Sequence, residues 1–147
     1  MQPEDLQHLR THREQIVDAH IQAETATHDI RAALATFRHP RYEVPAFGAI
    51  ADGAEAVEGL LGQLLGAFPD FWVRRIATHH ADGAVIVECK FGGTHQGEWA
   101  GIPPSGKRME VQAACVFVFD GADLVCEKVY FDHATILRQL GQGSREP

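Results

Sequence analysis

The sequence predicts an α+β fold in which N-terminal helices pack against a curved, mostly antiparallel sheet. Up to about residue 68, apolar residues recur every three or four positions, a spacing that is typical of helices. From about residue 71 to residue 131 they alternate with polar residues or form short continuous runs, as in strands. Turn-forming pairs such as Asp82-Gly83 separate these runs and favour antiparallel neighbours. Helices on one face of such a sheet leave a natural pocket between the two layers.

Two helices are predicted at the start of the chain. The first spans residues 4–25 and gathers a set of side chains near one face: Leu9, Ile16, Val17, His20 and Ile21. The second spans residues 29–37 and ends before Pro40, because the residue that precedes a proline is disfavoured in a helix. Together they supply apolar surface to cover the sheet.

A third helix is predicted after an interrupted segment. Residues 42–47 contain Pro45, which fits at best an edge strand because proline cannot donate to a sheet. Asp52 and Glu55 then have the spacing of a capping box, in which each side chain bonds an amide at the start of a helix. The helix that they open continues as an apolar stripe and ends at Pro69.

Five strands are predicted in the second half of the chain: residues 71–78, 84–91, 94–101, 108–119 and 124–131. Gly92-Gly93 permits a bulge or kink after the second of them. The fourth is apolar on both faces between Ala113 and Phe119, so both of its faces need to be covered. Because the helices can cover only one face, we expect a homodimer that forms through the other face of the sheet.

Composition limits the possible partners and location. The chain of 147 residues is 45% hydrophobic and 22% charged, and we expect a single domain over residues 1–147 with a loose tail at residues 142–147. A net charge of -7 without a basic run argues against nucleic-acid binding. No apolar stretch suits a signal peptide or a membrane span. The three cysteines stand singly in strand-like runs, which favours a cytoplasmic protein without disulfides.

Several short motifs carry a resemblance to a known family. They are Ala67-Phe68-Pro69-Asp70, Gly93-Thr94-His95-Gln96-Gly97, Gly101-Ile102-Pro103-Pro104-Ser105-Gly106-Lys107, and Tyr130-Phe131-Asp132 followed by Leu140-Gly141. With the order of helices and strands, they resemble the SnoaL-like polyketide cyclases of the NTF2-like superfamily over roughly residues 10–141. The resemblance implies an NTF2-like cone of helices against the sheet. It also implies that Asp132 matches the family's general base, which drives a cofactor-free intramolecular aldol closure of a polyketide ester.

Asp132 has a second possible role. Residues 133–141 fit a short helix that ends at a glycine, and Asp132 stands at its N-cap position. A base must lie where water is scarce and needs a raised pKa or an already acidic substrate. Capping would instead stabilise the helix by ~0.5–2 kcal/mol and lower the carboxyl pKa. Asp132→Asn separates the two roles, because Asn caps a helix but cannot take the proton, and on the catalytic hypothesis we predict a folded, inactive variant.

Other candidate site residues accompany Asp132. His95 is a candidate catalytic residue that would donate to a substrate carbonyl or orient Asp132, or else a half-exposed strand histidine. Gln112 would face the pocket or lie at a subunit contact. Four aromatic residues suit a flat ligand, although such residues also form cores: Phe68, Phe71, Trp99 and Tyr130.

The sequence favours chemistry without a metal or cofactor. Histidine pairs such as His79-His80 are adjacent in a predicted strand and would point to opposite faces, so we expect no metal site. No phosphate loop or dinucleotide-binding unit is present. We therefore predict a cofactor-independent enzyme acting on a hydrophobic carbonyl compound, a polyketide cyclase first and an isomerase or dehydratase next. The alternative is a non-catalytic small-molecule-binding module with the same pocket.

Overall fold

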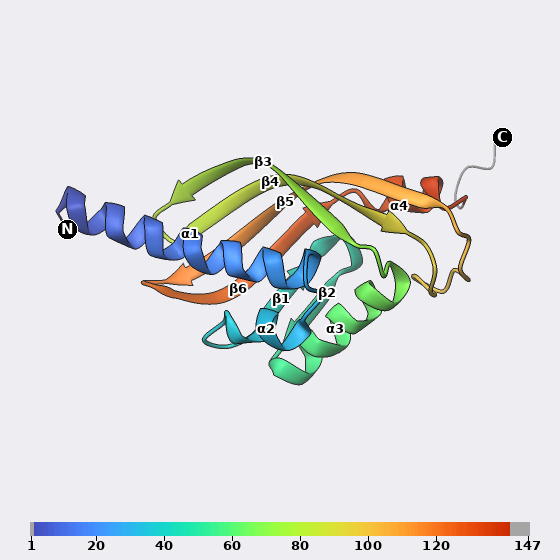
Figure 1. Cartoon of the computed structure of the whole chain (residues 1–147), viewed down its shortest axis with the longest axis horizontal. Coiled ribbons are helices and arrows are strands. Elements are labelled where there is room, and N and C mark those ends of the chain that lie inside the picture. Colours follow the sequence, from blue (N-terminus) through green and yellow to red (C-terminus); the bar gives the residue numbers. More distant parts are fainter. Residues whose placement is uncertain (1, 142–147) are drawn as a thin grey trace.

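The computed structural model describes residues 2–141, so the tail predicted at residues 142–147 lies outside the described part of the chain. Its helices are α1 (Pro3–Thr25), α2 (Ile30–Ala35), the short 3-10 helix η1 (Pro45–Phe47), α3 (Ala54–Ala67) and α4 (His133–Gln139). Its strands are β1 (Arg41–Val44), β2 (Ala49–Asp52), β3 (Trp72–Ala81), β4 (Ala84–Thr94), β5 (Arg108–Asp120) and β6 (Asp123–Phe131) (Figure 1).

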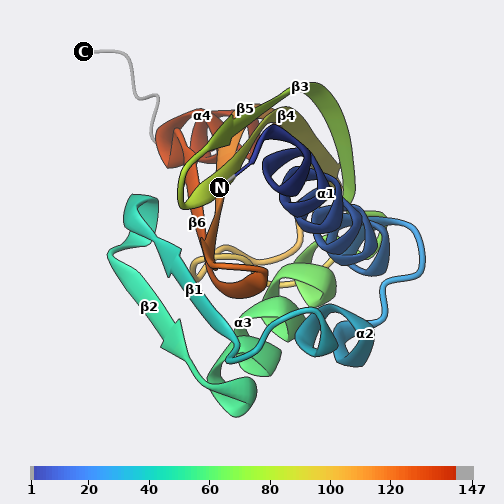
Figure 2. The same cartoon turned by 90° about the vertical axis from the view of Figure 1, so that its left-hand side faces the viewer.

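The strands form one curved sheet that confirms the predicted α+β class. Their order is β2-β1-β6-β5-β4-β3, and neighbours are antiparallel except for β1 and β6, which run parallel. Helices α1, α2 and α3 lie on the concave side of this sheet, whereas α4 lies at the end of the sheet away from the N-terminus (Figures 1 and 2). The parallel pairing sets Tyr42 of β1 opposite Glu127 of β6, which positions the site described below.

Two strand predictions were wrong. Residues 42–47 are not an edge strand, since β1 pairs with β2 on one side and β6 on the other, and Pro45 falls in η1 where it removes no sheet hydrogen bond. Residues 94–101 do not form a strand beyond Thr94, the last residue of β4. The amides of Gln96 and Gly97 instead donate to the carbonyl of Ala67, at 2.9 and 3.1 Å, which fixes this segment to the end of α3.

The predicted capping box and the predicted bulge at Gly92 do not form. Gly53 caps α3 without a side-chain hydrogen bond, while Asp52 ends β2 and accepts a hydrogen bond from His39 Nε2 at 3.0 Å, so no capping box forms. Gly92 stays in register with its neighbour strand, and the register shifts lie elsewhere in the sheet. A Cβ at Gly92 would stand 2.6 Å from the Met109 carbonyl oxygen and from the Trp72 ring, so glycine here allows a close approach rather than a bulge.

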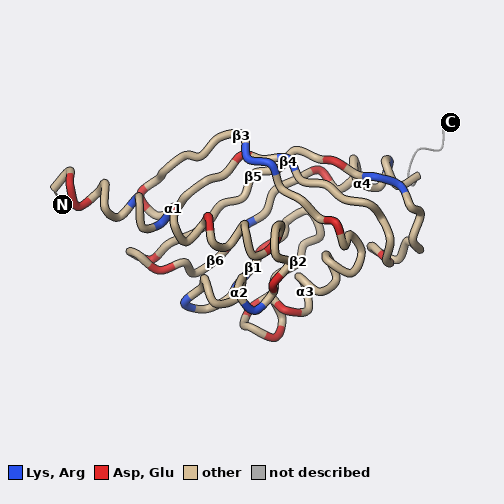
Figure 3. The backbone as a smooth tube through the Cα atoms, viewed as in Figure 1, with Lys and Arg blue, Asp and Glu red and all other residues tan. Residues whose placement is uncertain are grey.

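The interior is apolar and the charges lie mostly outside it. One core cluster joins α1, α2 and α3 to the middle of the sheet, and a second joins the end of α3 to α4 and the other end of the sheet. Acidic and basic residues are interspersed along the described chain (Figure 3). No helix within residues 2–141 is long and apolar enough to cross a membrane.

Candidate active site

A largely apolar cavity lies between the helices and the concave face of the sheet. Its volume is about 90 Å³. Side chains from β3, β4, β5 and β6 line one side of it, and the α3 residues Leu60, Leu61 and Leu64 line the other. Its charged lining residues are Glu24 and Glu127, with the Tyr42 hydroxyl beside them. A pocket of this kind suits an apolar ligand that carries few polar groups.

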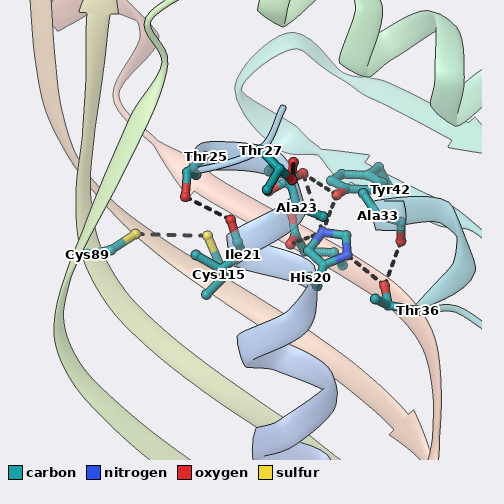
Figure 4. Close-up of polar contacts among 12 residues, drawn as sticks. His20, Ile21, Ala23, Thr25, Thr27, Ala33, Thr36, Tyr42, Cys89 and Cys115 are labelled. Atoms are coloured by element: carbon teal, nitrogen blue, oxygen red, sulfur yellow. Dashed lines mark hydrogen bonds and ion pairs between the residues drawn. The ribbon is translucent and has the colours of Figure 1, made fainter. Parts of the chain in front are cut away.

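The polar lining belongs to a buried cluster of four side chains. His20 and Glu24 lie one helical turn apart on α1 and so share a face, and Tyr42 and Glu127 face them from β1 and β6. His20 Nε2 lies 2.6 Å from Tyr42 Oη and 3.3 Å from a carboxylate oxygen of each glutamate. Tyr42 Oη donates to Glu24 Oε1 at 2.5 Å. Figure 4 shows His20 between Thr36 and Tyr42.

The hydrogen bonds assign both protons of His20. The Thr36 hydroxyl donates to the carbonyl of Ala33 at 2.6 Å, so it accepts from His20 Nδ1 at 2.8 Å. The Tyr42 hydroxyl donates to Glu24, so it accepts from His20 Nε2. A histidine that donates from both nitrogens is an imidazolium cation. The cluster therefore holds one buried positive charge between two carboxyl groups.

The same environment shifts the pKa of each member. Burial lowers the pKa of His20, but attraction to Glu24 and hydrogen bonds to both glutamates more than offset this and raise it to about 10. Burial also opposes ionisation of Glu24, yet the charge of His20 holds the pKa of Glu24 below its ordinary value. Burial, then repulsion from Glu24, raises the pKa of Glu127 to about 7 despite the attraction of His20. Burial and the two carboxylates raise the pKa of Tyr42 well above its usual range, so its hydroxyl stays protonated.

Glu127 therefore combines two properties that proton-transfer catalysis requires. Its carboxyl group lines an apolar cavity, and its pKa of about 7 lets it accept or donate a proton near neutral pH. His20 lies behind it as a fixed positive charge. The arrangement can remove a proton from a bound carbon acid and return it.

The cluster also contains residue types that bind metals. Ligand atoms of His20, Glu24 and Glu127 lie within 4.8 Å of one another. An imidazolium has no free lone pair for an ion, and the hydrogen bonds described above occupy both nitrogens of His20 and one oxygen of Glu24. We therefore interpret the cluster as a group that shares protons.

Asp132 does not lie in this cavity. Its side chain is 62% exposed and caps α4, accepting hydrogen bonds from the Ala134 amide at 3.0 Å and the Thr135 hydroxyl at 2.9 Å. These bonds, led by the one from Thr135, lower the pKa of Asp132. It lines an open groove that also contains Lys90 and Gln112. The expectation of a dry carboxylate at the base of the pocket is wrong for Asp132, because the local capping geometry holds it in solvent.

His95 is fully buried, not half-exposed, and does not line the cavity. Its Nδ1 accepts a hydrogen bond from the Ser105 amide at 3.2 Å, and its ring packs 5.7 Å from the ring of Phe68. Its backbone exchanges hydrogen bonds with Gly106 and Lys107. The structure thus makes His95 an anchor of the segment that joins β4 to β5, with hydrogen bonds to that segment and not to Asp132.

The remaining predicted ligand contacts are divided between the cavity and other places. Phe71 and Trp99 line the cavity. Phe68 is buried beside Trp99 in the second core cluster, with ring centroids 5.4 Å apart. Gln112 is exposed, and Tyr130 is 44% exposed. The structure therefore places two of the four predicted aromatic residues, Phe71 and Trp99, in the cavity wall.

Sequence reasoning did not single out the four residues of the buried cluster. Its available signals were a histidine within the apolar stripe of α1, with Glu24 one turn later, and Glu127 inside an apolar strand. No sequence signal links Tyr42 to Glu127, because their contact depends on the parallel pairing of β1 with β6. Buried polar side chains within apolar patterns were thus the sign of this site.

Comparison with known proteins agrees with the geometry of the fold. The family described as SnoaL-like polyketide cyclase matches residues 11–140. Among solved structures, a candidate SnoaL-like polyketide cyclase from Jannaschia sp. CCS1 is similar with a TM-score of 0.78 and 16% identity, over 91% of this chain and 94% of that one. AclR, a candidate hydroxylase from Streptomyces galilaeus, is similar with a TM-score of 0.76 and 20% identity, over 92% of this chain and 84% of that one. A search of curated protein sequences found no match.

A further solved structure extends the fold comparison. A protein from Catenulispora acidiphila with a ketosteroid isomerase-like fold, in complex with trimethylamine, is similar with a TM-score of 0.74 and 22% identity. The match covers 90% of this chain and 97% of that one. At these identities the solved structures establish a shared fold, and the predicted cone of helices on a curved sheet is confirmed.

Proposed function

Because this chain belongs to the SnoaL-like polyketide cyclase family, we propose that it is a cofactor-independent enzyme that transfers a proton next to a carbonyl group of a hydrophobic substrate. Cyclisation of a polyketide-like ester is the reaction that we propose first, and an isomerisation or dehydration at the same site comes next. The supporting observation is Glu127, a carboxyl group with a pKa of about 7 in the wall of an apolar cavity.

In the proposed mechanism Glu127 is the general base. Its carboxylate takes a proton from the carbon beside a substrate carbonyl, and the resulting enolate attacks a second carbonyl of the same molecule to close a ring. The new alkoxide then takes up a proton, which the Glu127 carboxyl can supply. His20 offers a fixed positive charge 3.3 Å from Glu127, which stabilises negative charge in a site with little water. A positioned base contributes roughly 10²–10⁴-fold in rate, so the substrate itself needs an acidic carbon, as in a 1,3-dicarbonyl compound.

We propose Glu127, and not Asp132, as the general base. The family resemblance implies a general base at Asp132, but this carboxylate is exposed, caps α4 and has a lowered pKa. An exposed carboxylate with a low pKa is a weak base towards carbon. Glu24 is also a weaker candidate than Glu127, because Tyr42 and His20 already hold its ionised form.

The proposal is tested by hydrogen exchange at carbon. β-Dicarbonyl compounds and anthraquinone-type esters in deuterium oxide are followed by NMR, which detects proton removal whether or not a ring closes. We expect wild-type protein to catalyse exchange and Glu127→Gln to lose at least about 10²-fold of that rate. The matched control, Asp132→Asn, keeps its cap and should retain most of the activity.

Two different results would contradict the proposal that Glu127 is a catalytic base. Loss of activity in Asp132→Asn with activity retained in Glu127→Gln would return the base to Asp132. Binding without exchange for every substrate would favour a non-catalytic small-molecule-binding module.

We also propose that two copies associate through the sheet face away from the helices. By strand alternation, Ala114 and Val116 of β5 point away from the buried Phe117 side, and Tyr130 pairs with Ala114 on the same outer face. Light scattering that gives twice the mass of one chain would support a homodimer. Substitution Val116→Glu should then give a folded monomer, and an unchanged mass for that variant would contradict this interface.

A further inference from the structure

A second, open groove adjoins the cavity. It lies between η1, the end of α3 and the segment around Trp99, and its volume is about 750 Å³ against about 90 Å³ for the cavity. Phe47, Leu60 and Trp99 line both spaces, so these side chains form the wall between them. The groove is also lined by two polar side chains that do not line the cavity, Gln63 and Glu98.

The two aromatic residues of the wall, Phe47 and Trp99, pack against His133, and a hydrogen bond joins Trp99 to His133. The ring of Phe47 lies edge-on to Trp99 and His133, with centroids 5.5 and 4.5 Å away. Trp99 Nε1 donates to His133 Nε2 at 3.2 Å. Because indole nitrogen only donates, His133 must be neutral at Nε2. Burial keeps the pKa of His133 below its ordinary value, against the pull of Asp132, which maintains this bond at neutral pH.

Trp99 is the fixed side of the wall. Its amide and carbonyl exchange hydrogen bonds with Ile102 at 3.1 and 2.8 Å, and the two residues between them have positive φ, Ala100 at 50° and Gly101 at 79°. These angles describe a tight two-residue hairpin. Before this hairpin, the Gly97 amide donates to the Ala67 carbonyl, and Gly97 packs closely against the end of α3.

Phe47 is the less restrained side. It ends the three-residue η1 between two four-residue strands, and it is 37% exposed. Its aromatic contacts are to Trp99, Phe131 and His133. A rotation of this one side chain would connect the cavity to the groove without moving a strand.

We propose that the cavity and the groove are two chambers of one binding site, and that Phe47 is a specificity-determining residue that controls how long a ligand fits. The cavity is small compared with the roughly 300–1,000 Å³ of typical ligand pockets, so a ligand of ordinary size extends past the wall. The ligand class is an elongated, largely apolar carbonyl compound. Its acidic carbon reaches Glu127, and a hydroxyl or amide at its far end donates to Glu98 or Gln63. This assignment rests on the proposed function for the choice of ligand class.

Calorimetric titration of two probes tests the assignment. The short probe is 2-acetyl-1-naphthol, and the long probe is a three-ring hydroxyanthraquinone methyl ester. We expect Phe47→Ala to change the ratio of the two dissociation constants by roughly tenfold in favour of the long probe. Phe47→Trp should change it in the opposite direction. The control Ile50→Ala alters an apolar residue of β2 that is 61% exposed and lines neither space, and it should leave the ratio unchanged.

A second variant tests the outer chamber. Glu98→Gln should weaken the long probe and leave the short probe unaffected, because only the long one reaches the groove. An equal effect of Phe47→Ala on both probes, the same ratio change in Ile50→Ala, or no binding of the long probe to any form would overturn the two-chamber assignment. Calorimetry needs no turnover, so its outcome stays separate from the exchange assay on Glu127.

Discussion

His20 Nε2 lies 3.3 Å from Oε1 of Glu127, although one residue belongs to the first helix and the other to the last strand. Both side chains are almost entirely buried. The contact exists only because α1 crosses the concave face where β6 pairs with β1. Folding therefore assembles the charged cluster, and the cluster in turn makes the stability of the fold depend on charge and on pH.

Removal of His20 should strongly destabilise the protein. His20→Gln leaves Glu24 and Glu127 buried without their cation, and breaking one partner of a buried ion pair costs about 3–5 kcal/mol. Urea unfolding followed by circular dichroism measures this loss. The control is His79→Gln, which breaks an exposed pair with Glu88 and should cost less than about 1 kcal/mol.

A double variant identifies the cause of that loss. His20→Gln combined with Glu127→Gln removes one of the stranded carboxylates, so part of the stability should return. Additive losses in the double variant would mean that packing, and not charge, explains the effect of His20→Gln.

Stability should decline as the pH rises from mildly acidic to alkaline values. The pKa of Glu127 is about 7 in the folded protein against an ordinary 4.5, so its contribution is present below pH 4.5 and is lost as the pH rises through 7. The pKa of His20 is about 10 against an ordinary 6.5, so its contribution is complete below pH 6.5 and is lost as the pH rises through 10. Glu24, whose pKa is lowered, acts in the opposite direction and loses its contribution in acid.

Chemical denaturation at a series of pH values measures this pH dependence of stability. The free energy of unfolding should be greatest near pH 4.5, where Glu24 is already ionised while Glu127 and His20 both keep their protons. It should fall towards neutral pH and again towards pH 10. Glu127→Gln should remove the first of these two declines, and a wild-type profile that stays level between pH 5 and 8 would argue against an elevated pKa at Glu127.

The rate of proton transfer should follow the ionisation of Glu127. If Glu127 is the base, kcat/KM rises as the pH increases through about 7 and falls again only as His20 loses its proton near 10. If Asp132 is the base, its lowered pKa predicts a rate that is level from pH 5 upwards. Stopped-time exchange assays across this range, with Asp132→Asn as the comparison, distinguish the two profiles.

The sequence predicted the fold where local signals were strong. Periodic apolar residues indicated α1, α3 and the long strands, and the motifs around Gly93 and Tyr130 indicated the family. The pairing of β1 with β6 escaped prediction because it joins short segments far apart in sequence, and periodicity carries no information on such partners. For the same reason, the cluster that includes Tyr42 and Glu127 was not predicted from the sequence.

Asp132 illustrates a different difficulty. The family resemblance and the local helix-start pattern assigned it different roles, and the sequence supplied no measure of its exposure. In the structure the capping pattern accounts for both of its hydrogen bonds and for its place in solvent. A helix cap involves only neighbouring residues, so that role could be predicted from the local sequence. The position of Asp132 relative to the cavity depends on the arrangement of the whole sheet, so it could not.

Gly97 provides a test of how the fold holds the wall of the proposed binding site. A Cβ at this position would stand 2.1 Å from the carbonyl oxygen of Gly66 and 2.8 Å from its carbonyl carbon, both of them backbone atoms that cannot turn aside. Gly97→Ala must therefore push the segment that carries Trp99 away from α3, at a cost of about 1–3 kcal/mol or more for an overpacked contact. Gly62→Ala is the matched control, since it lies inside α3 with nothing within 4 Å of the added carbon. Alanine there should stabilise the helix by roughly 0.5–1 kcal/mol.

Urea unfolding measures both changes, and titration of the long probe shows whether Gly97→Ala also weakens binding in the groove. If Gly97→Ala is as stable as wild type and binds the long probe equally well, the segment around Trp99 is not held by α3, and the fixed side of the wall must be sought in its hydrogen bond to His133.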